Sequence, residues 1–220
     1  MKSFMYLTLA MLIVMTSSVP IAAMPMEVKN TFSCANVTEI PQVECEALVA
    51  LYQNTRGDKW MYNINWLVTN TPSNWYGVSV ESAHVKGLYL SDRHGFWGNH
   101  LSGILPPELG NLTFLTDLNL MMNELYGSIP PELGRLTNLN TLFLSANYSI
   151  SGKIPPEIGN LASLTYLDLS QNQLTGGLPP ELGDLTSLTY LRLSDNQLTG
   201  GLPAELGNLT SLTDLRLSNN

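Results

Sequence analysis

The stretch 164–187, LTYLDLSQNQLTGGLPPELGDLTS, decides the fold because the chain repeats its pattern from residue 85 onward. The spacing Leu-x-x-Leu-x-Leu marks where each unit begins, at Val85, Leu115, Leu139, Leu164, Leu188 and Leu212. Successive starts lie 30, 24, 25, 24 and 24 residues apart, so the first unit carries an insertion around 92–98 and the third has one extra residue near Tyr148. This period predicts short units that stack on one another, with the insertions in loops.

Each repeated residue type has a physical role in such a unit. Leu191 and Leu193 are two positions apart, so both point to one face of a short strand while Arg192 points to the other. The Pro-Pro-Glu-Leu-Gly segments fit a short helical turn that begins with proline. Asparagine recurs where the chain leaves the strand, and its side chain can satisfy backbone groups that the bend leaves unpaired; this column is Asn123, Asn147, Asn172 and Asn196.

The unit resembles the leucine-rich repeat family, and its LTGxxP segment and 24-residue period are similar to the plant-type extracellular class. The resemblance covers residues 85–220. It implies an α/β repeat fold, a right-handed leucine-rich repeat solenoid with a parallel concave sheet, with five complete units and a truncated sixth. It also implies an asparagine ladder along the column of Asn side chains.

Residues 24–84 are expected to form an N-terminal cap that covers the first open face of the array. A helix is predicted over 41–55, with an apolar stripe formed by Val43, Ala47, Leu48, Leu51 and Tyr52. The segments ALxALYxxTxGxxW and NWxxxxxxxxxWYGV resemble the cap of the plant-type family. The cysteine pair usual in that cap would fall at Ser73 and Val80, so packing by Trp60, Trp66 and Trp75 has to replace it. We expect Cys34 and Cys45 to form a disulfide instead.

Residues 1–23 are predicted to be a signal peptide, because a lysine at position 2 precedes the apolar run 4–15 and a small-residue stretch follows. The chain is therefore expected to be secreted or displayed at the cell surface. Ten Lys and Arg against 18 Asp and Glu give a net charge of −8. This acidic balance excludes nucleic acid and anionic lipid as main partners.

No catalytic motif was found, so we expect neither an enzyme nor a bound cofactor or metal. A remote alternative is a metal-dependent enzyme that uses the loop 92–100, where Asp92, His94 and His100 could share a cation. The interpretation that we favour is a solvated loop, in which His94, Phe96 and Trp97 are candidate ligand contacts.

The outward positions of the strands vary while the scaffold repeats, which is typical of a recognition surface. We expect this concave face to bind a protein, peptide or glycan through Tyr89, Asn119, Phe143, Tyr166, Asp168, Tyr190, Arg192 and Arg216. A purely structural alternative remains for some of them. Asp168 and Arg192 could form a cross-strand ion pair, and Tyr166 could stack on Tyr190.

Asn36, Asn111 and Asn208 lie in sequons that would accept glycans in a eukaryotic secretory pathway, whereas Asn147 is expected to be occupied by the ladder. The sequence stops without a terminal cap, and we expect a fragment of a longer protein whose exposed last leucines promote self-association. The chain could accordingly be the start of a transmembrane receptor whose signalling domain lies beyond Asn220.

Overall fold

The computed structural model describes residues 32–91 and 98–220. The predicted signal peptide and the loop candidates His94, Phe96 and Trp97 lie outside the described residues. No helix in the described ranges is both long enough and apolar enough to cross a membrane.

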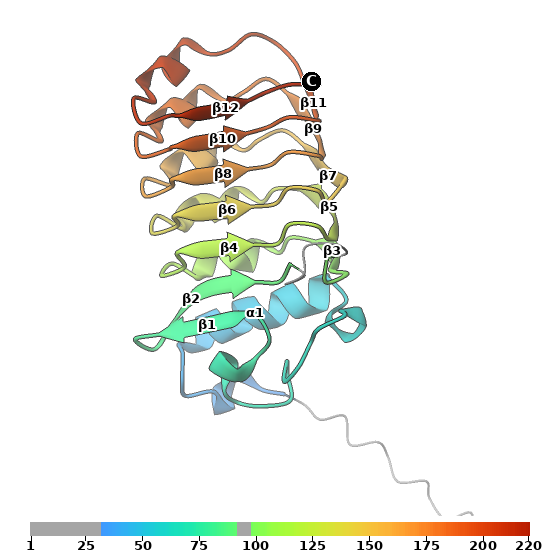
Figure 1. Ribbon diagram of the computed structural model, residues 1–220. Coiled ribbons are helices and arrows are strands. Elements are labelled where there is room, and N and C mark those ends of the chain that lie inside the picture. The colour runs from blue at the N-terminus through green and yellow to red at the C-terminus, as the bar shows by residue number, and fades with distance from the viewer. Residues whose placement is uncertain (1–31, 92–97) are drawn as a thin grey trace, which may run out of the picture. The chain divides into compact units, whose positions relative to one another are not determined.

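The described part of the chain stacks its units so that equivalent strands pair side by side (Figure 1). One sheet has the order β1 (Val78–Glu81), β2 (His84–Tyr89), β4 (Asp117–Asn119), β6 (Thr141–Phe143), β8 (Tyr166–Asp168), β10 (Tyr190–Arg192) and β12 (Asp214–Arg216). β1 is antiparallel to β2, and every later pair in this sheet is parallel. The expected solenoid with a parallel sheet is confirmed.

A second parallel sheet follows the turns, and short 3-10 helices complete each unit. The second sheet contains β3 (Ser102–Ile104), β5 (Glu124–Ser128), β7 (Ser149–Gly152), β9 (Gln173–Gly176) and β11 (Gln197–Leu198). The helices of the units are η4 (Pro107–Asn111), η5 (Pro131–Arg135), η6 (Pro156–Asn160), η7 (Pro180–Asp184) and η8 (Ala204–Asn208). η4 to η7 begin with proline, which fits an N-terminal position that needs no backbone donor.

Leucines from the strands and the 3-10 helices fill the space between these layers. Leu118, Leu142, Leu167 and Leu191 occupy one column of the first sheet and are fully buried. A unit alone could not cover these side chains, so each unit depends on its neighbours for its stability.

The asparagine column forms a hydrogen-bonded ladder. Asn123 donates from Nδ2 to the carbonyls of Leu90 and Leu120, both at 3.1 Å, and its Oδ1 accepts the N–H of Leu101 at 3.0 Å. Asn147, Asn172 and Asn196 repeat the donor pattern, and Asn99 and Asn220 extend the column at its two ends.

The ladder has one fault, next to the extra residue of the third unit. Tyr148 is exposed and has a positive φ of 57°. Paired residues of β5 and β7 are one residue further apart in the sequence than paired residues of β3 and β5 or of β7 and β9. The Oδ1 atom of Asn172 is buried and has no hydrogen-bond partner among the described residues. The inserted residue therefore costs the ladder one acceptor bond.

The helix α1 (Gln42–Asn54) packs against η4 and so covers the first unit (Figure 1). Trp60, Trp66 and Trp75 are buried and pack in series, with ring centroids 4.9 and 5.1 Å apart. Each indole N–H donates to a backbone carbonyl, so no polar atom of these rings is stranded in the core. Three further 3-10 turns complete this region: η1 (Cys34–Asn36), η2 (Gly57–Lys59) and η3 (Pro72–Asn74).

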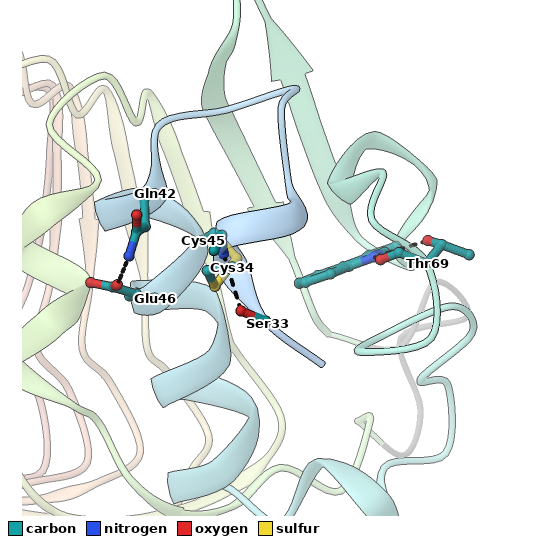
Figure 2. The surroundings of a disulfide bond; sticks show 8 residues. Ser33, Cys34, Gln42, Cys45, Glu46 and Thr69 are labelled. Atoms are coloured by element: carbon teal, nitrogen blue, oxygen red, sulfur yellow. Dashed lines mark hydrogen bonds between the residues drawn. A yellow bond between two sulfur atoms is a disulfide. The ribbon is translucent and has the colours of Figure 1, made fainter. Parts of the chain in front are cut away.

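A disulfide joins Cys34 of η1 to Cys45 of α1 (Figure 2). At one of the two positions where the family usually has cysteines, Ser73 instead donates its backbone N–H to Oε2 of Glu39 at 2.8 Å. That bond ties the leading segment 33–40 to η3, and the disulfide ties it to α1.

The predicted apolar stripe of the helix is wrong at one position. Val43 is 45% exposed, whereas its neighbour Glu44 is buried. Glu44 accepts the backbone N–H of Val85 at 2.8 Å and contacts Nδ1 of His84 at 2.6 Å. A buried carboxylate is tolerated here because β2 supplies both partners, and this contact ties the helix to the sheet.

Candidate functional site

The strand register places the predicted binding residues in two adjacent columns on one face of the seven-stranded sheet, which we call the sheet face. The first column, in order along the array, is Tyr89, Asn119, Phe143, Asp168, Arg192 and Arg216. The second is Gly87, Asp117, Thr141, Tyr166, Tyr190 and Asp214. All of these strands keep one register, so side chains from six units are brought together.

An aromatic cluster occupies the middle of the sheet face. Phe143 meets Tyr166 edge to face with ring centroids 4.8 Å apart, and Tyr166 stacks on Tyr190 at 4.7 Å. The guanidinium of Arg192 lies over both tyrosines, 5.1 Å from the ring centroid of Tyr166 and 5.9 Å from that of Tyr190. Burial raises the pKa of Tyr166, so its hydroxyl stays protonated at neutral pH.

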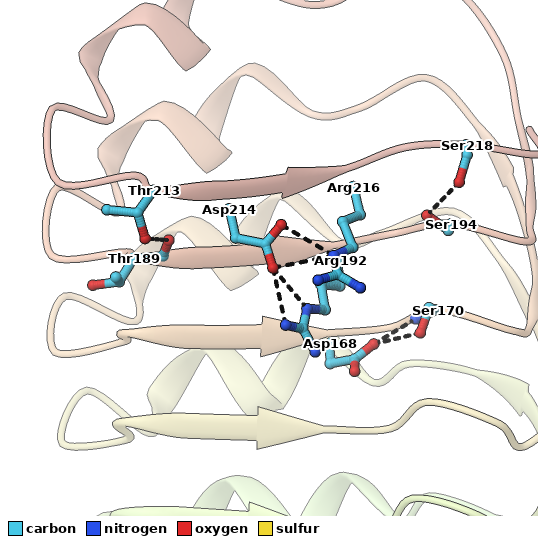
Figure 3. Close-up of polar contacts among 9 residues, drawn as sticks. All are labelled: Asp168, Ser170, Thr189, Arg192, Ser194, Thr213, Asp214, Arg216 and Ser218. Atoms are coloured by element: carbon cyan, nitrogen blue, oxygen red, sulfur yellow. Dashed lines mark hydrogen bonds and ion pairs between the residues drawn. The ribbon is translucent and has the colours of Figure 1, made fainter.

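Two arginines hold one carboxylate beside this cluster (Figure 3). Oδ2 of Asp214 accepts from Nε and Nη2 of Arg192, at 3.1 and 2.9 Å, and both of its oxygens accept from Nε of Arg216 at 3.1 Å. Hydrogen bonds from Arg216 first, and from Arg192 second, lower the pKa of Asp214. The hydrogen bond to Asp214 raises the pKa of Arg192. Arg192 is therefore fixed in place before any ligand arrives.

The ion pair considered between Asp168 and Arg192 does not form. Arg192 turns to Asp214 on the next strand, and Oδ1 of Asp168 accepts from the N–H and the hydroxyl of Ser170, at 3.0 and 2.6 Å (Figure 3). The stack of Tyr166 on Tyr190 does form. Asp214 and Asp117 are functional candidates that our set of site residues omitted, although both belong to the outward column that the repeat spacing defines.

Tyr89 and Asn119 occupy the end of the sheet face that adjoins the cap. Tyr89 is 46% exposed, and its ring lies over Gly87, where a Cβ atom would come within 2.9 Å of the ring carbon Cζ. Oδ1 of Asn119 accepts the N–H of Met121 at 3.2 Å, which fixes the plane of its amide. Both side chains line a hollow between the sheet face and the cap stretch 73–79.

The proposed metal loop lies largely outside the described residues, because Asp92 and His94 belong to the segment 92–97. Nδ1 of His100 contacts Oε1 of Glu124 at 2.9 Å on the exposed surface. In the part of the chain that the structure describes, no three His, Cys, Asp or Glu side chains are placed to hold a metal ion.

The candidate glycosylation sites differ in accessibility. Asn36 and Asn208 are exposed, and Asn111 is half-buried at the end of η4. Asn147 is 2% exposed and its amide nitrogen donates to Leu144 within the ladder, so it is not accessible to a glycan.

Comparisons with known proteins agree with the architecture. Residues 143–220 match a family model described as a leucine-rich repeat region. The leucine-rich repeat ectodomain of the receptor kinase SOBIR1 from Arabidopsis thaliana is similar over 82% of this chain and 94% of its own, with 25% identity and a TM-score of 0.67. The BIR3–SERK2 complex from Arabidopsis thaliana is similar over 81% of this chain and 98% of the matched chain, with 29% identity and a TM-score of 0.62.

A third similar structure is the plant peptide hormone receptor RGFR1, solved in complex with RGF2. It shares 46% identity over 53% of this chain, with a TM-score of 0.52, and this chain spans only 18% of its length. The repeat array, the asparagine ladder and these likenesses define a leucine-rich repeat protein. The likeness to plant receptor ectodomains supports the plant-type extracellular class of that family.

Proposed function

We propose that this protein is an extracellular recognition module that binds an extended peptide segment on its sheet face. The observation that carries the proposal is the cluster of Tyr166, Tyr190 and Arg192, which is organised before binding and lies on the sheet surface. Tyrosine and arginine are the residue types that most often anchor an interface, and an anchor that is already fixed loses little side-chain entropy on binding.

A peptide fits this surface better than a compact partner would. Strands in one sheet are about 4.8 Å apart, so successive outward side chains offer regularly spaced contacts along the array. The polarity also changes along it, from Phe143 through the tyrosines to the exposed Arg216. RGFR1 is a peptide hormone receptor, and HAESA was solved with a peptide hormone ligand, which supports a peptide as the ligand class.

An extracellular location is supported by three separate features. The sequence begins with the predicted signal peptide, Cys34 and Cys45 are joined in a disulfide, and the similar structures include receptor ectodomains. Disulfides persist mainly in oxidising compartments outside the cytosol.

A second candidate function is the ectodomain of a transmembrane receptor. Several similar structures are ectodomains of receptor kinases, and this likeness favours it. The sequence of the complete gene tests it: an apolar span of about 20 residues after the repeats would support a receptor. A terminating repeat followed by a stop codon would leave a free secreted binder.

The binding proposal is tested by selecting ligands from a random peptide library displayed on phage against the purified protein. Peptides that bind the wild type should lose at least about tenfold in affinity when Tyr166 and Tyr190 are both changed to alanine. Tyr126→Ala is the matched control, because this tyrosine is 49% exposed but belongs to β5 in the other sheet. Selected peptides that bind the double variant as well as the wild type would refute the proposed site.

A further inference from the structure

The hollow at the cap end of the sheet face differs in chemistry from the aromatic and arginine cluster. It has a volume of about 650 Å³, within the range of small-ligand sites. The cap stretch 73–79 forms one side, and Tyr89, Ser91 and Asn119 form the other. None of the described residues that line it carries a charge at neutral pH, although the chain has 28 charged side chains, 10 basic and 18 acidic.

Tyr89 presents its ring to this hollow in a fixed position. The backbone of Gly87 lies in the extended region, so glycine is not needed there for its conformation. A Cβ atom at this position would instead collide with the Tyr89 ring. Equivalent positions in later units carry Asp117, Thr141 and Tyr166, so the missing side chain makes room for the ring in this unit alone.

Asp117 holds the other end of this ring. Burial raises the pKa of Tyr89, and the charge of Asp117 and a hydrogen bond to it raise it further, so the hydroxyl remains a donor at neutral pH. Thr116 and Thr141 donate to the same carboxylate, at 2.8 and 2.6 Å. The carboxylate of Asp117 is therefore already hydrogen-bonded to neighbouring residues. Asp117 does not line the hollow, but it holds the Tyr89 ring in place.

These features restrict the ligand class. Among the described lining residues, an anion would find no cationic side chain, and it would meet the negative charge of Asp117. A cation would find no carboxylate among the same described residues. A purely apolar molecule would leave the polar groups of Ser79, Ser91 and Asn119 unpaired. A neutral polyhydroxylated ring can satisfy both parts of the surface, since its C–H face packs on an aromatic ring while its hydroxyls pair with hydroxyls and amides.

We propose that the hollow between the cap and the first two repeats is a binding site for a neutral saccharide, with Tyr89 as its stacking platform and Asn119 and Ser91 as its hydrogen-bonding groups. This site goes beyond the proposed peptide function. It lies at the other end of the sheet face from Arg192 and Arg216, and neither site needs the other.

The test uses the intact protein and four neutral trisaccharides, namely cellotriose, maltotriose, mannotriose and N,N′,N″-triacetylchitotriose, with trigalacturonate as the acidic comparison. Binding is measured by isothermal titration calorimetry and by shifts of tyrosine ring resonances in NMR spectra. At least one neutral trisaccharide should bind and shift the Tyr89 resonances but not those of Tyr190, and trigalacturonate should bind more weakly. No binding at millimolar concentration, tighter binding of the acidic sugar, or shifts centred on Tyr190 would overturn the proposal.

Two variants test the platform itself. Tyr89→Ala removes the ring, and Gly87→Ala keeps the ring but displaces it from its seat, so each should weaken saccharide binding about tenfold or more. Gly201→Ala is the matched glycine control, because a Cβ atom there has no neighbour within 4 Å. Tyr190→Ala should leave saccharide binding unchanged even where it abolishes peptide binding, so failure of one proposal is distinguishable from failure of the other. Unaltered affinity in folded Gly87→Ala and Tyr89→Ala would refute the site.

Discussion

Replacing Asn147 with alanine should destabilise the protein more than the same change at Asn172, although both residues belong to the ladder. Asn147 donates to the carbonyls of Leu120 and Leu144, at 3.2 and 2.9 Å, and accepts the N–H of Leu125 at 3.1 Å. Its removal deletes three hydrogen bonds: the N–H of Leu125 loses its partner, whereas the carbonyls of Leu120 and Leu144 keep the amides of Asn123 and Asn172. At about 1 kcal/mol or slightly more for each, the expected loss is about 3 to 4 kcal/mol.

Asn172 makes the same two donor contacts, at 3.0 Å to the carbonyls of Leu144 and Leu169, but its Oδ1 has no acceptor contact. Asn172→Ala should therefore cost about 2 to 3 kcal/mol, roughly 1 kcal/mol less than Asn147→Ala. The difference is more reliable than either value because both changes delete the same atoms in similar surroundings.

The assay is equilibrium unfolding in urea, followed by far-UV circular dichroism and by tryptophan fluorescence. Circular dichroism reports mainly on the repeats, whereas three of the four tryptophans, at 60, 66 and 75, lie in the cap. Repeat arrays can lose cooperativity, so the two transitions must coincide before the free energies are compared. Equal losses at the two positions, or a larger loss at Asn172, would refute the account of the ladder fault.

Three further predictions concern the cap and the arginine clamp, by which Arg192 and Arg216 hold the carboxylate of Asp214. Glu44→Ala should cost about 3 kcal/mol in urea unfolding, because it strands the buried N–H of Val85, whereas Glu46→Ala on the exposed side of the same helix should change the stability by less than about 0.5 kcal/mol. Trp75→Ala should cost about 3 to 5 kcal/mol, more than the roughly 2 to 3 kcal/mol lost on reducing the disulfide, and thermal unfolding with and without reductant ranks the two. Because the pKa of Asp214 is lowered in the folded state, its contribution to stability is present above the unfolded pKa of about 3.9 and is lost as the pH falls through the lower folded value. An acid titration of Asp214→Asn should lack that loss, and an unchanged titration curve would contradict the clamp.

The repeat spacing made the sheet face predictable, because a constant period fixes which residues stand side by side. Tyr166 and Tyr190 were placed together from their positions in equivalent units alone, and the structure stacks their rings. The partner of Arg192 was not predictable in this way. Asp168 and Asp214 lie on the strands on either side of Arg192. The choice between them depends on side-chain conformation, and Asp168 is already hydrogen-bonded to Ser170.

The cap was harder to predict because it has no internal repeat. A helical stripe indicates which face is apolar, but it cannot show that β2 brings a backbone donor and a histidine to Glu44. The role of Gly87 was missed for a related reason: the residue fits a strand by itself, and only the position of the Tyr89 ring explains why it is glycine.

The central proposal is that the peptide ligand lies on the sheet face, and a residue-resolved NMR titration with a library-selected peptide tests it most directly. We expect the backbone amide perturbations to concentrate in 141–143, 166–168, 190–192 and 214–216, the strands that carry the aromatic cluster and the arginine clamp. Perturbations concentrated in the second sheet, over 124–128, 149–152 and 173–176, would contradict the proposal.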